Sequence, residues 1–219
     1  MSFSDQLLAD STALWEAQKD HPFVTELAVG ALDETAFKHW VRQDYRYLLD
    51  YARLFAIVGA KARDERTMTQ LFAIAHSTLD TEMDLHREFA SEYGIDRKTL
   101  ERTTKSPTCE AYTSFLVRTA YEGTFAESVA ALYPCGQGYL DIGRHAANLA
   151  TTEHRYTPWI EMYTSEEFAE AVGMMRDLVD RCGEKFPGER EAMREAFLTS
   201  ARFEHAFWEM AYTQEQWEI

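Results

Sequence analysis

The chain has 219 residues, 46% of them hydrophobic and 13% aromatic, which is enough to bury a large core within one domain spanning residues 1–219. Its 37 acidic residues outnumber 22 basic ones, and the net charge of -15 predicts no binding to nucleic acid or anionic lipid, because like charges repel. The sequence shows neither an apolar leader nor an uncharged apolar run of about 18 residues, so it predicts neither export nor a membrane span.

Capping residues, prolines and glycines, which mark helix starts and ends, predict helices throughout the chain. Ser4 is expected to cap the first helix, His21-Pro22 to end it, and Asp33, Asp64 and Ser106-Pro107 to start later ones. Helices are expected at residues 4–19, 33–62, 64–93, 106–123, 125–134, 135–150, 165–182 and 189–212, with a short helical piece at 158–162. Strand-like alternation of polar and apolar residues is almost absent, so the sequence predicts an all-α bundle.

The proline at position 134 is expected to break a helix, because it cannot donate to the carbonyl of Ala130 and crowds it. A helix that restarts there would place Cys135 in its first turn, where the helix dipole favours the thiolate, the form that attacks electrophiles. The other two cysteines, Cys109 and Cys182, are expected to be small buried apolar groups. The chain has no C-x-x-C pattern, so the sequence predicts neither a disulfide framework nor a zinc site. Its cysteines fit a protein of the reducing cytoplasm best.

Three apolar helix faces are interrupted by polar groups. Asp44 interrupts the face of the second helix, Glu204 that of the last helix, and Cys135 with Tyr139 that of the segment after residue 125. A buried carboxylate is either a structural group satisfied by its neighbours or a functional one, and both interpretations stay open for Asp44 and Glu204. Since no internal cation is evident, a raised pKa and proton transfer near neutral pH are expected.

Glu82 and His86 lie one helical turn apart and suggest two alternatives, a metal site or a structural pair. The structural interpretation is favoured, because di-iron bundles need Glu-x-x-His motifs and the chain has none. The tryptophans at positions 15, 40, 159 and 208 are expected to be core anchors.

Several segments together make the chain resemble the TenA family, known as thiaminase II or aminopyrimidine aminohydrolase. They are His21-Pro22-Phe23-Val24, Phe37 to Tyr47 with Gln43-Asp44, Glu82 to Phe89, Ser106-Pro107-Thr108 with Tyr112-Thr113-Ser114, Ala131 to Cys135, Trp159-Ile160 with Tyr163, and Phe203-Glu204 with Phe207-Trp208 and Met210-Ala211-Tyr212. The resemblance covers nearly the whole chain.

This resemblance implies a haem-oxygenase-like helical fold without haem or another cofactor, a homotetramer, and hydrolysis of aminopyrimidines in thiamin salvage. It also implies that Cys135 attacks the pyrimidine ring, that Asp44 binds the ring nitrogen and exocyclic amine, and that Glu204 handles protons. The pocket would be lined by Tyr47, Tyr112, Tyr139, Tyr163 and Phe207.

The chain departs from the family at Gly136-Gln137-Gly138, where family members often carry bulkier residues. A wider or differently gated pocket would follow, and the preference between thiamin and its degraded aminopyrimidine stays open, with the latter favoured. Two other functions are weighed. One is an oxidase on the same bundle, either di-iron or cofactorless, and the other is a regulatory protein without catalytic activity.

Overall fold

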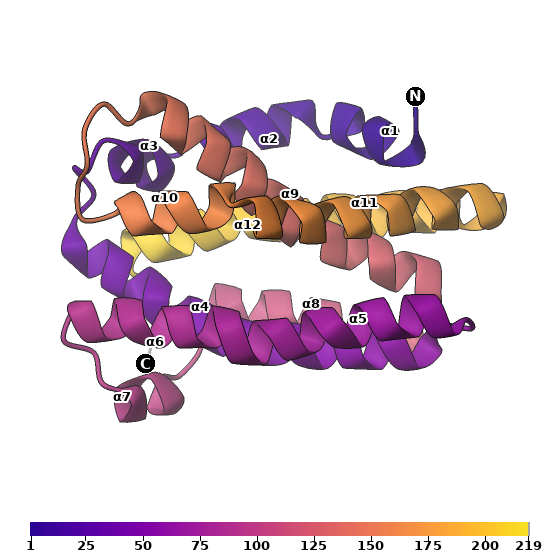
Figure 1. Cartoon of the computed structure of the whole chain (residues 1–219), viewed down its shortest axis with the longest axis horizontal. Coiled ribbons are helices and arrows are strands. Elements are labelled where there is room, and N and C mark those ends of the chain that lie inside the picture. Colours follow the sequence, from indigo (N-terminus) through magenta and orange to yellow (C-terminus); the bar gives the residue numbers. More distant parts are fainter. Residues whose placement is uncertain (219) are drawn as a thin grey trace. The chain divides into compact units, whose positions relative to one another are not determined.

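The computed structural model describes residues 1–218, and all regular structure within that range is helical. This confirms the expected all-α class. The elements are α1 (Phe3–Asp10), α2 (Thr12–Lys19), α3 (Pro22–Ala28), α4 (Glu34–Lys61), α5 (Glu65–Ser77), η1 (Thr78–Glu82), α6 (Met83–Glu92), α7 (Arg97–Arg102), α8 (Pro107–Glu122), α9 (Phe125–Leu149), α10 (Thr157–Thr164), α11 (Glu166–Lys185), η2 (Pro187–Glu189) and α12 (Arg190–Thr213) (Figure 1).

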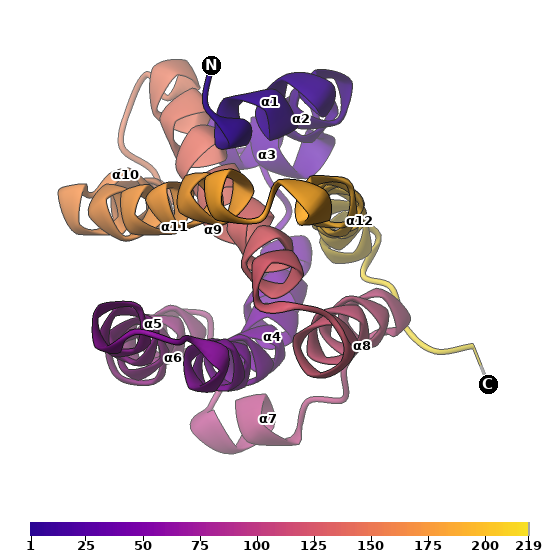
Figure 2. The same cartoon turned by 90° about the vertical axis from the view of Figure 1, so that its right-hand side faces the viewer.

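The helices form two compact units. The first contains Met1–Leu32 and Ala126–Glu209, and the second contains Asp33–Phe125 and residues 210–218. In the first unit α11 packs against α1 and α10. In the second, α4 packs against α5, α6 and α8, and Figure 2 shows α4 between α5 and α8. That the chain is one domain stays a prediction.

Side-chain caps explain where most helices begin. The side chains of Asp33, Asp64, Ser106 and Ser165 each accept a hydrogen bond from a backbone N–H in the first turn of α4, α5, α8 and α11. These starts agree with the predicted ones.

The first predicted helix is wrong in two respects. Its cap is Ser2, which forms a reciprocal capping box with Asp5, whereas Ser4 donates its hydroxyl to Asp180 at 3.0 Å. The helix also ends at Asp10, because Ser11 turns back and donates its hydroxyl to the carbonyl of Leu7 at 2.9 Å. The result is two helices, α1 and α2, in place of one.

The predicted break at Pro134 is also wrong, because α9 runs without interruption from Phe125 to Leu149. A proline inside a helix costs about 3 kcal/mol. Side chains on both sides of it are buried, and Val129, Leu132 and Ile142 are at most 2% exposed. Burying each such side chain stabilises the fold by about 1.5–3 kcal/mol, so packing outweighs the lost hydrogen bond.

The predicted helix over residues 64–93 is divided into α5, the π-helical segment η1 and α6. The short helix α7 comes after α6. The N–H of Met83 reaches back to the carbonyl of Thr78, five residues earlier, which is the π-helical pattern. Such segments often occur at functional sites.

Large aromatic side chains fill both cores. Trp159, Trp208 and Phe197 of the first unit and Trp40 and Phe55 of the second are at most 1% exposed. Together with Trp15, which is 7% exposed, the four tryptophans expected to be core anchors are buried. Within residues 1–218, none of the helices has both the length and the apolar character needed to cross a bilayer.

Candidate active site

The thiol and the two carboxylates that interrupt apolar helix faces are buried. Asp44 in α4 and Glu204 in α12 are each 3% exposed, and Cys135 in α9 is 9% exposed. Cys135 and Glu204 belong to the first unit, and Asp44 belongs to the second. The inward direction predicted from the sequence is confirmed for all three, and their common participation in one site is still a prediction.

Cys135 lies in the middle of α9, not at a helix N-terminus. The argument that a helix dipole activates its thiol is therefore wrong, since the dipole acts within the first turn of a helix. The other two thiols match the expectation of inert packing groups. Burial raises the pKa of Cys182 to about 11 and also raises the pKa of Cys109, so both are thiols at neutral pH.

An aromatic cluster of the first unit includes Tyr139, one turn beyond Cys135 on the same face of α9. We call Tyr139, Trp159, Tyr163 and Trp208 the aromatic cluster. The ring centroid of Tyr139 lies 4.6 Å from that of Tyr163 and 5.0 Å from that of Trp208, and the Trp159 and Tyr163 centroids are 4.7 Å apart. Because α9, α10 and α12 each contribute to it, the cluster provides flat apolar faces next to two phenol groups.

Phe207 is 3% exposed and follows Glu204 by three residues, so the two share one face of α12. This face is therefore apolar around the carboxylate, as the sequence predicted.

The segment Gly136-Gln137-Gly138 is packed within the first unit. Gln137 is 7% exposed and accepts a hydrogen bond from the hydroxyl of Tyr133 at 2.8 Å. A Cβ atom at Gly136 would lie 3.3 Å from Val172, whereas at Gly138 the nearest atom, on Gln18, would be 3.9 Å away. Gly136 is therefore the tighter position, and Gly138 has room for a methyl group.

A second cluster surrounds Asp44 in the other unit. The Nε2 atom of His86 in α6 lies 2.5 Å from Oδ2 of Asp44 in α4, and Nδ1 lies 2.9 Å from the backbone carbonyl of Glu82 at the end of η1. His86 is 0% exposed, and its ring contacts that of Trp40 with the centroids 5.4 Å apart. We call Asp44, Glu82 and His86 the Asp44 cluster.

The pKa values in this cluster depend on burial and on neighbouring charges. Burial by itself would lower the pKa of His86, but the hydrogen bond and charge of Asp44, with the charge of Glu82, outweigh it and raise the pKa. Burial raises the pKa of the half-buried Glu82 to about 7, an effect that His86 opposes and Asp44 reinforces. The expectation that Asp44 has no basic partner inside the fold is wrong, because His86 bonds to it.

Both ring nitrogens of His86 are engaged by Asp44 and by the Glu82 carbonyl, so neither points to a shared metal position. Within residues 1–218, no three His, Cys, Asp or Glu side chains are grouped so that they could hold a metal ion. The structural interpretation of Glu82 and His86 is therefore the better one. The sequence placed His86 on an inward face, but it gave no indication of the contact with Asp44.

Tyr47 and Tyr112 form the remaining predicted aromatic pair. Both are buried, at 3% and 1% exposure, and their ring centroids are 5.2 Å apart. Tyr51 extends the group, with its centroid 5.4 Å from that of Tyr47. Since Tyr47 follows Asp44 by three residues on α4, it shares the helix face that carries the carboxylate, and Tyr112 of α8 packs against it.

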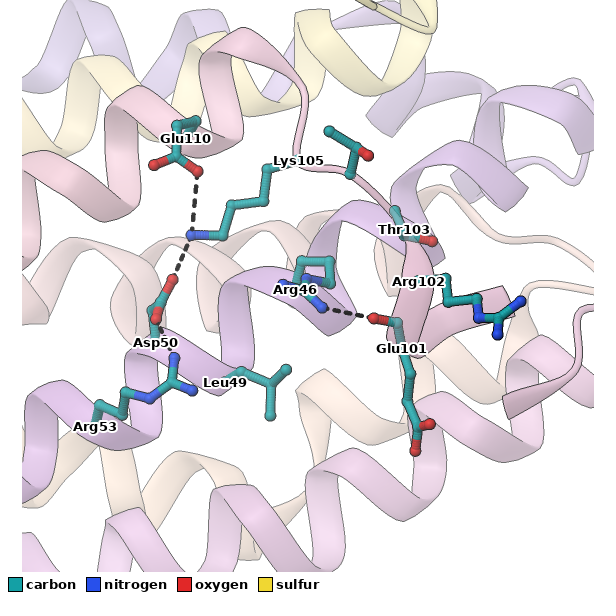
Figure 3. Close-up of a pocket in the computed structure, with 10 residues that line it drawn as sticks. Arg46, Leu49, Asp50, Arg53, Glu101, Arg102, Thr103, Lys105 and Glu110 are labelled. Atoms are coloured by element: carbon teal, nitrogen blue, oxygen red, sulfur yellow. Dashed lines mark hydrogen bonds and ion pairs between the residues drawn. The ribbon is translucent and has the colours of Figure 1, made fainter. Parts of the chain in front are cut away.

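A charged pocket on the surface of the second unit was not predicted. It has a volume of about 470 Å³, and Figure 3 shows Lys105 between Asp50 and Glu110, with Arg53 also paired to Asp50. Arg46 donates to the carbonyl of Glu101 at 2.8 Å. These ion pairs engage Arg53 and Lys105, two of the four cations that line the pocket, and we assign the pocket no ligand.

Comparison with known proteins gives a consistent result. A model of the TENA/THI-4/PQQC family matches residues 8–214. The chain is 37% identical to a protein of Halalkalibacterium halodurans named aminopyrimidine aminohydrolase, over 99% of this chain and 98% of that protein. It is 34% identical to the protein of the same name from Bacillus subtilis, over 99% of this chain and 92% of that protein.

Solved structures agree with these relatives. A TenA homologue from P. horikoshii OT3 superimposes with a TM-score of 0.91 at 30% identity, covering 97% of this chain and 99% of that one. A domain with a heme oxygenase-like fold from Shewanella denitrificans superimposes with a TM-score of 0.75 at 15% identity, covering 96% of this chain and 92% of that one. The second similarity shows the fold alone and confirms the expected haem-oxygenase-like architecture.

Proposed function

The chain belongs to the TENA/THI-4/PQQC family, and from this membership we propose that it is an aminopyrimidine aminohydrolase of thiamin salvage, or thiaminase II. One observation carries the proposal. Two relatives with this name are 37% and 34% identical to the chain over 99% of its length. The burial of a thiol and two carboxylates on otherwise apolar helix faces supports it, since such groups are costly to bury without a function or partner.

Cys135 is the nucleophile in this proposal. An aminopyrimidine becomes electrophilic when a ring nitrogen gains a proton, and the sulfur of Cys135 then adds to a neighbouring ring carbon. The bond between the exocyclic methylene and its amine breaks, and the amine leaves as ammonia after taking a proton. Water adds to the methylene carbon, the thiol is expelled, and the aromatic ring returns.

The two carboxylates have separate roles. Asp44 binds the amidine edge of the substrate, its ring nitrogen and exocyclic amine, and so selects which ring carbon meets the sulfur. Glu204 gives a proton to the leaving amine and takes one from the attacking water. Glu204 is buried on an otherwise apolar helix face, so bulk water does not compete with it for the proton.

The flat ring of the substrate is held between aromatic side chains, and we assign this binding role to Tyr47, Tyr112, Tyr139, Tyr163 and Phe207. Their support is the ring packing within each unit, with Tyr47 near Tyr112 and Tyr139 near Tyr163. Aromatic faces bind a planar heterocycle by stacking, and a phenol hydroxyl adds a polar contact at the rim.

The degraded aminopyrimidine is the preferred substrate in this proposal, with thiamin as the second. In this proposal the enzyme acts in the cytoplasm and needs no cofactor. It assembles as a homotetramer, which a molar mass measured by light scattering tests.

Incubation with each candidate substrate tests the function directly. The purified chain is incubated with the aminomethyl aminopyrimidine and with thiamin, and released ammonia and thiazole are measured. We expect ammonia from the first at a higher rate than thiazole from the second. Stoichiometric iron, with activity lost on chelation but kept in Cys135→Ala, would refute the hydrolase and favour the oxidase. Absence of both products would favour the regulatory protein without catalytic activity.

A matched pair of cysteine variants tests the nucleophile. Cys135→Ser should lose at least ~10²-fold in turnover, whereas Cys182→Ser should keep its turnover, because the second thiol is 3% exposed and stays protonated at neutral pH. Equal activity in both variants would show that Cys135 does not form the covalent bond.

A further inference from the structure

The Asp44 cluster contains a histidine to which the proposed reaction gives no role. His86 is 0% exposed and lies on α6, and both of its ring nitrogens have partners within the second unit. Burying a histidine and a carboxylate costs desolvation energy even when they bond to each other, so the pair is a candidate for a functional role.

The hydrogen bonds of His86 fix the positions of its protons. The carbonyl of Glu82 can only accept, so Nδ1, at 2.9 Å, must carry a hydrogen. The Nε2 atom lies 2.5 Å from Oδ2 of Asp44, so one further proton lies between these two atoms. The pair is therefore either an imidazolium with a carboxylate, or a neutral imidazole with a carboxylic acid.

The charges around the pair favour the first form. Asp44 from α4 and the Glu82 side chain from η1 are both acidic, and both raise the pKa of His86. From α8 the thiol of Cys109 faces Asp44, and its own raised pKa keeps it neutral. The rings of Trp40 and Phe89 contact the imidazole and keep water from it, with centroid distances of 5.4 Å and 6.4 Å.

We propose that His86 is a positioning residue, whose imidazolium orients the side chain of Asp44 and keeps it ionised for binding the amidine edge of an aminopyrimidine. The proposal rests on the function proposed above for Asp44. The carbonyl of Glu82 holds the imidazole in the required protonation state, and the π-helical segment that ends at this residue sets the position of that carbonyl. His86 acts through Asp44 and does not itself touch the substrate.

Two substitutions separate orientation from charge. Gln at position 86 can donate an amide N–H to Asp44 without a positive charge, whereas Leu removes both the donor and the charge. Losing a hydrogen bond to a charged group lowers binding by roughly 10- to 100-fold. We therefore expect kcat/KM to fall about 10-fold in His86→Gln and about 100-fold in His86→Leu, mainly through KM.

The dependence of kcat/KM on pH separates a positioning role from a structural one, because a purely structural substitution would not shift it. Without the imidazolium, Asp44 loses the positive charge that favours its ionised form, so the acid limb of kcat/KM should move to higher pH in both variants. His39→Leu is the matched control, because His39 is a buried histidine of the same unit, at 8% exposure, outside the Asp44 cluster. An unshifted acid limb in a folded His86→Leu protein overturns the proposal.

Nitrogen-15 NMR of the wild-type imidazole tests the pair without using activity. We expect both ring nitrogens of His86 to be protonated near neutral pH, and Asp44→Asn to lower the pKa of His86. A single protonated nitrogen, Nδ1 alone, would overturn the proposal even in a fully active enzyme. If the imidazolium is present but no aminopyrimidine is hydrolysed, the proposed function fails and the ion pair itself stands.

Discussion

Replacing Gly143 by alanine tests the close approach of α9 to α10. A Cβ atom at this position would lie 3.0 Å from the Cβ of Tyr163 and 3.2 Å from its backbone carbon and oxygen. Ordinary contacts begin at 3.4 Å, and a backbone atom cannot rotate out of the way. Overpacking of this kind costs about 1–3 kcal/mol, because α10 must move as a unit.

Gly173 in α11 provides a matched control, because a Cβ atom there would have no neighbour within 4 Å. Alanine stabilises a helix interior relative to glycine by about 0.5–1 kcal/mol, and this gain applies equally to both positions. It cancels when the two variants are compared, so the difference in their free energies of unfolding is the steric cost alone.

Thermal unfolding measures that difference. For a chain of this size about 1 kcal/mol changes Tm by roughly 2–4 °C, so Gly143→Ala should melt roughly 2–12 °C below Gly173→Ala. Because Tyr163 is proposed to line the pocket, KM for the aminopyrimidine should also rise in the first variant and stay constant in the second. Equal Tm values in the two variants would refute the reasoning, since they would show that α9 and α10 are not in close contact.

Three other predictions concern the site. Cys135→Ser and Asp44→Ala should each lose at least ~10²-fold in turnover while circular dichroism shows an intact fold, and near-wild-type rates in either would reject its role. For Glu82, the folded pKa of about 7 lies above the ordinary value of 4.5, so the native state binds the proton more tightly. The free energy of unfolding should therefore fall as pH rises between these values, and Glu82→Gln should flatten this slope in urea titrations; an unchanged slope would contradict the shift. Iodoacetamide should label Cys135 before Cys182 in peptide mass mapping, with the aminopyrimidine slowing the first reaction, because the pKa of Cys182 is raised to about 11.

The parts of the fold that depend on simple periodicity could be predicted from the sequence. The faces of α4 and α12 were identified correctly, including Asp44 and Glu204, because each is a long regular helix that buries one stripe against its neighbours. Helix starts at Asp33, Asp64 and Ser106 were also correct, since a cap is a local interaction between a side chain and its own first turn.

The continuity of α9 could not be predicted in this way. A proline has a fixed local cost, but whether a helix accepts it depends on how much apolar surface the residues on each side bury. The buried apolar surface depends on how α9 packs against the rest of its unit, and a local sequence pattern does not predict this packing. The same limit explains why the supposed dipole activation of Cys135 was wrong.

The π-helical segment η1 changes which side chains of the preceding helix α5 are buried. If the helix were regular as far as His86, Phe72 and Leu79 would lie on the same buried face as His86. Their side chains are instead 42% and 49% exposed, while Leu71 and Thr78 are 1% and 3% exposed. The next buried position after Thr78 is Met83, a step of five residues that matches the π-helical segment.

One extra residue turns the buried face of a helix by about 100°. The buried face therefore passes through Leu71, Ala75 and Thr78 up to the start of η1, and through Met83 and His86 after it. Glu82, whose carbonyl accepts from Nδ1 of His86, is the last residue of this segment. A π-helical segment has poorer hydrogen-bond geometry than an α-helix, and here the buried face that follows it includes His86, which bonds Asp44. Deleting Leu79 to return the segment to regular α-helix would turn α6 relative to α5, so the bond between His86 and Asp44 should be lost.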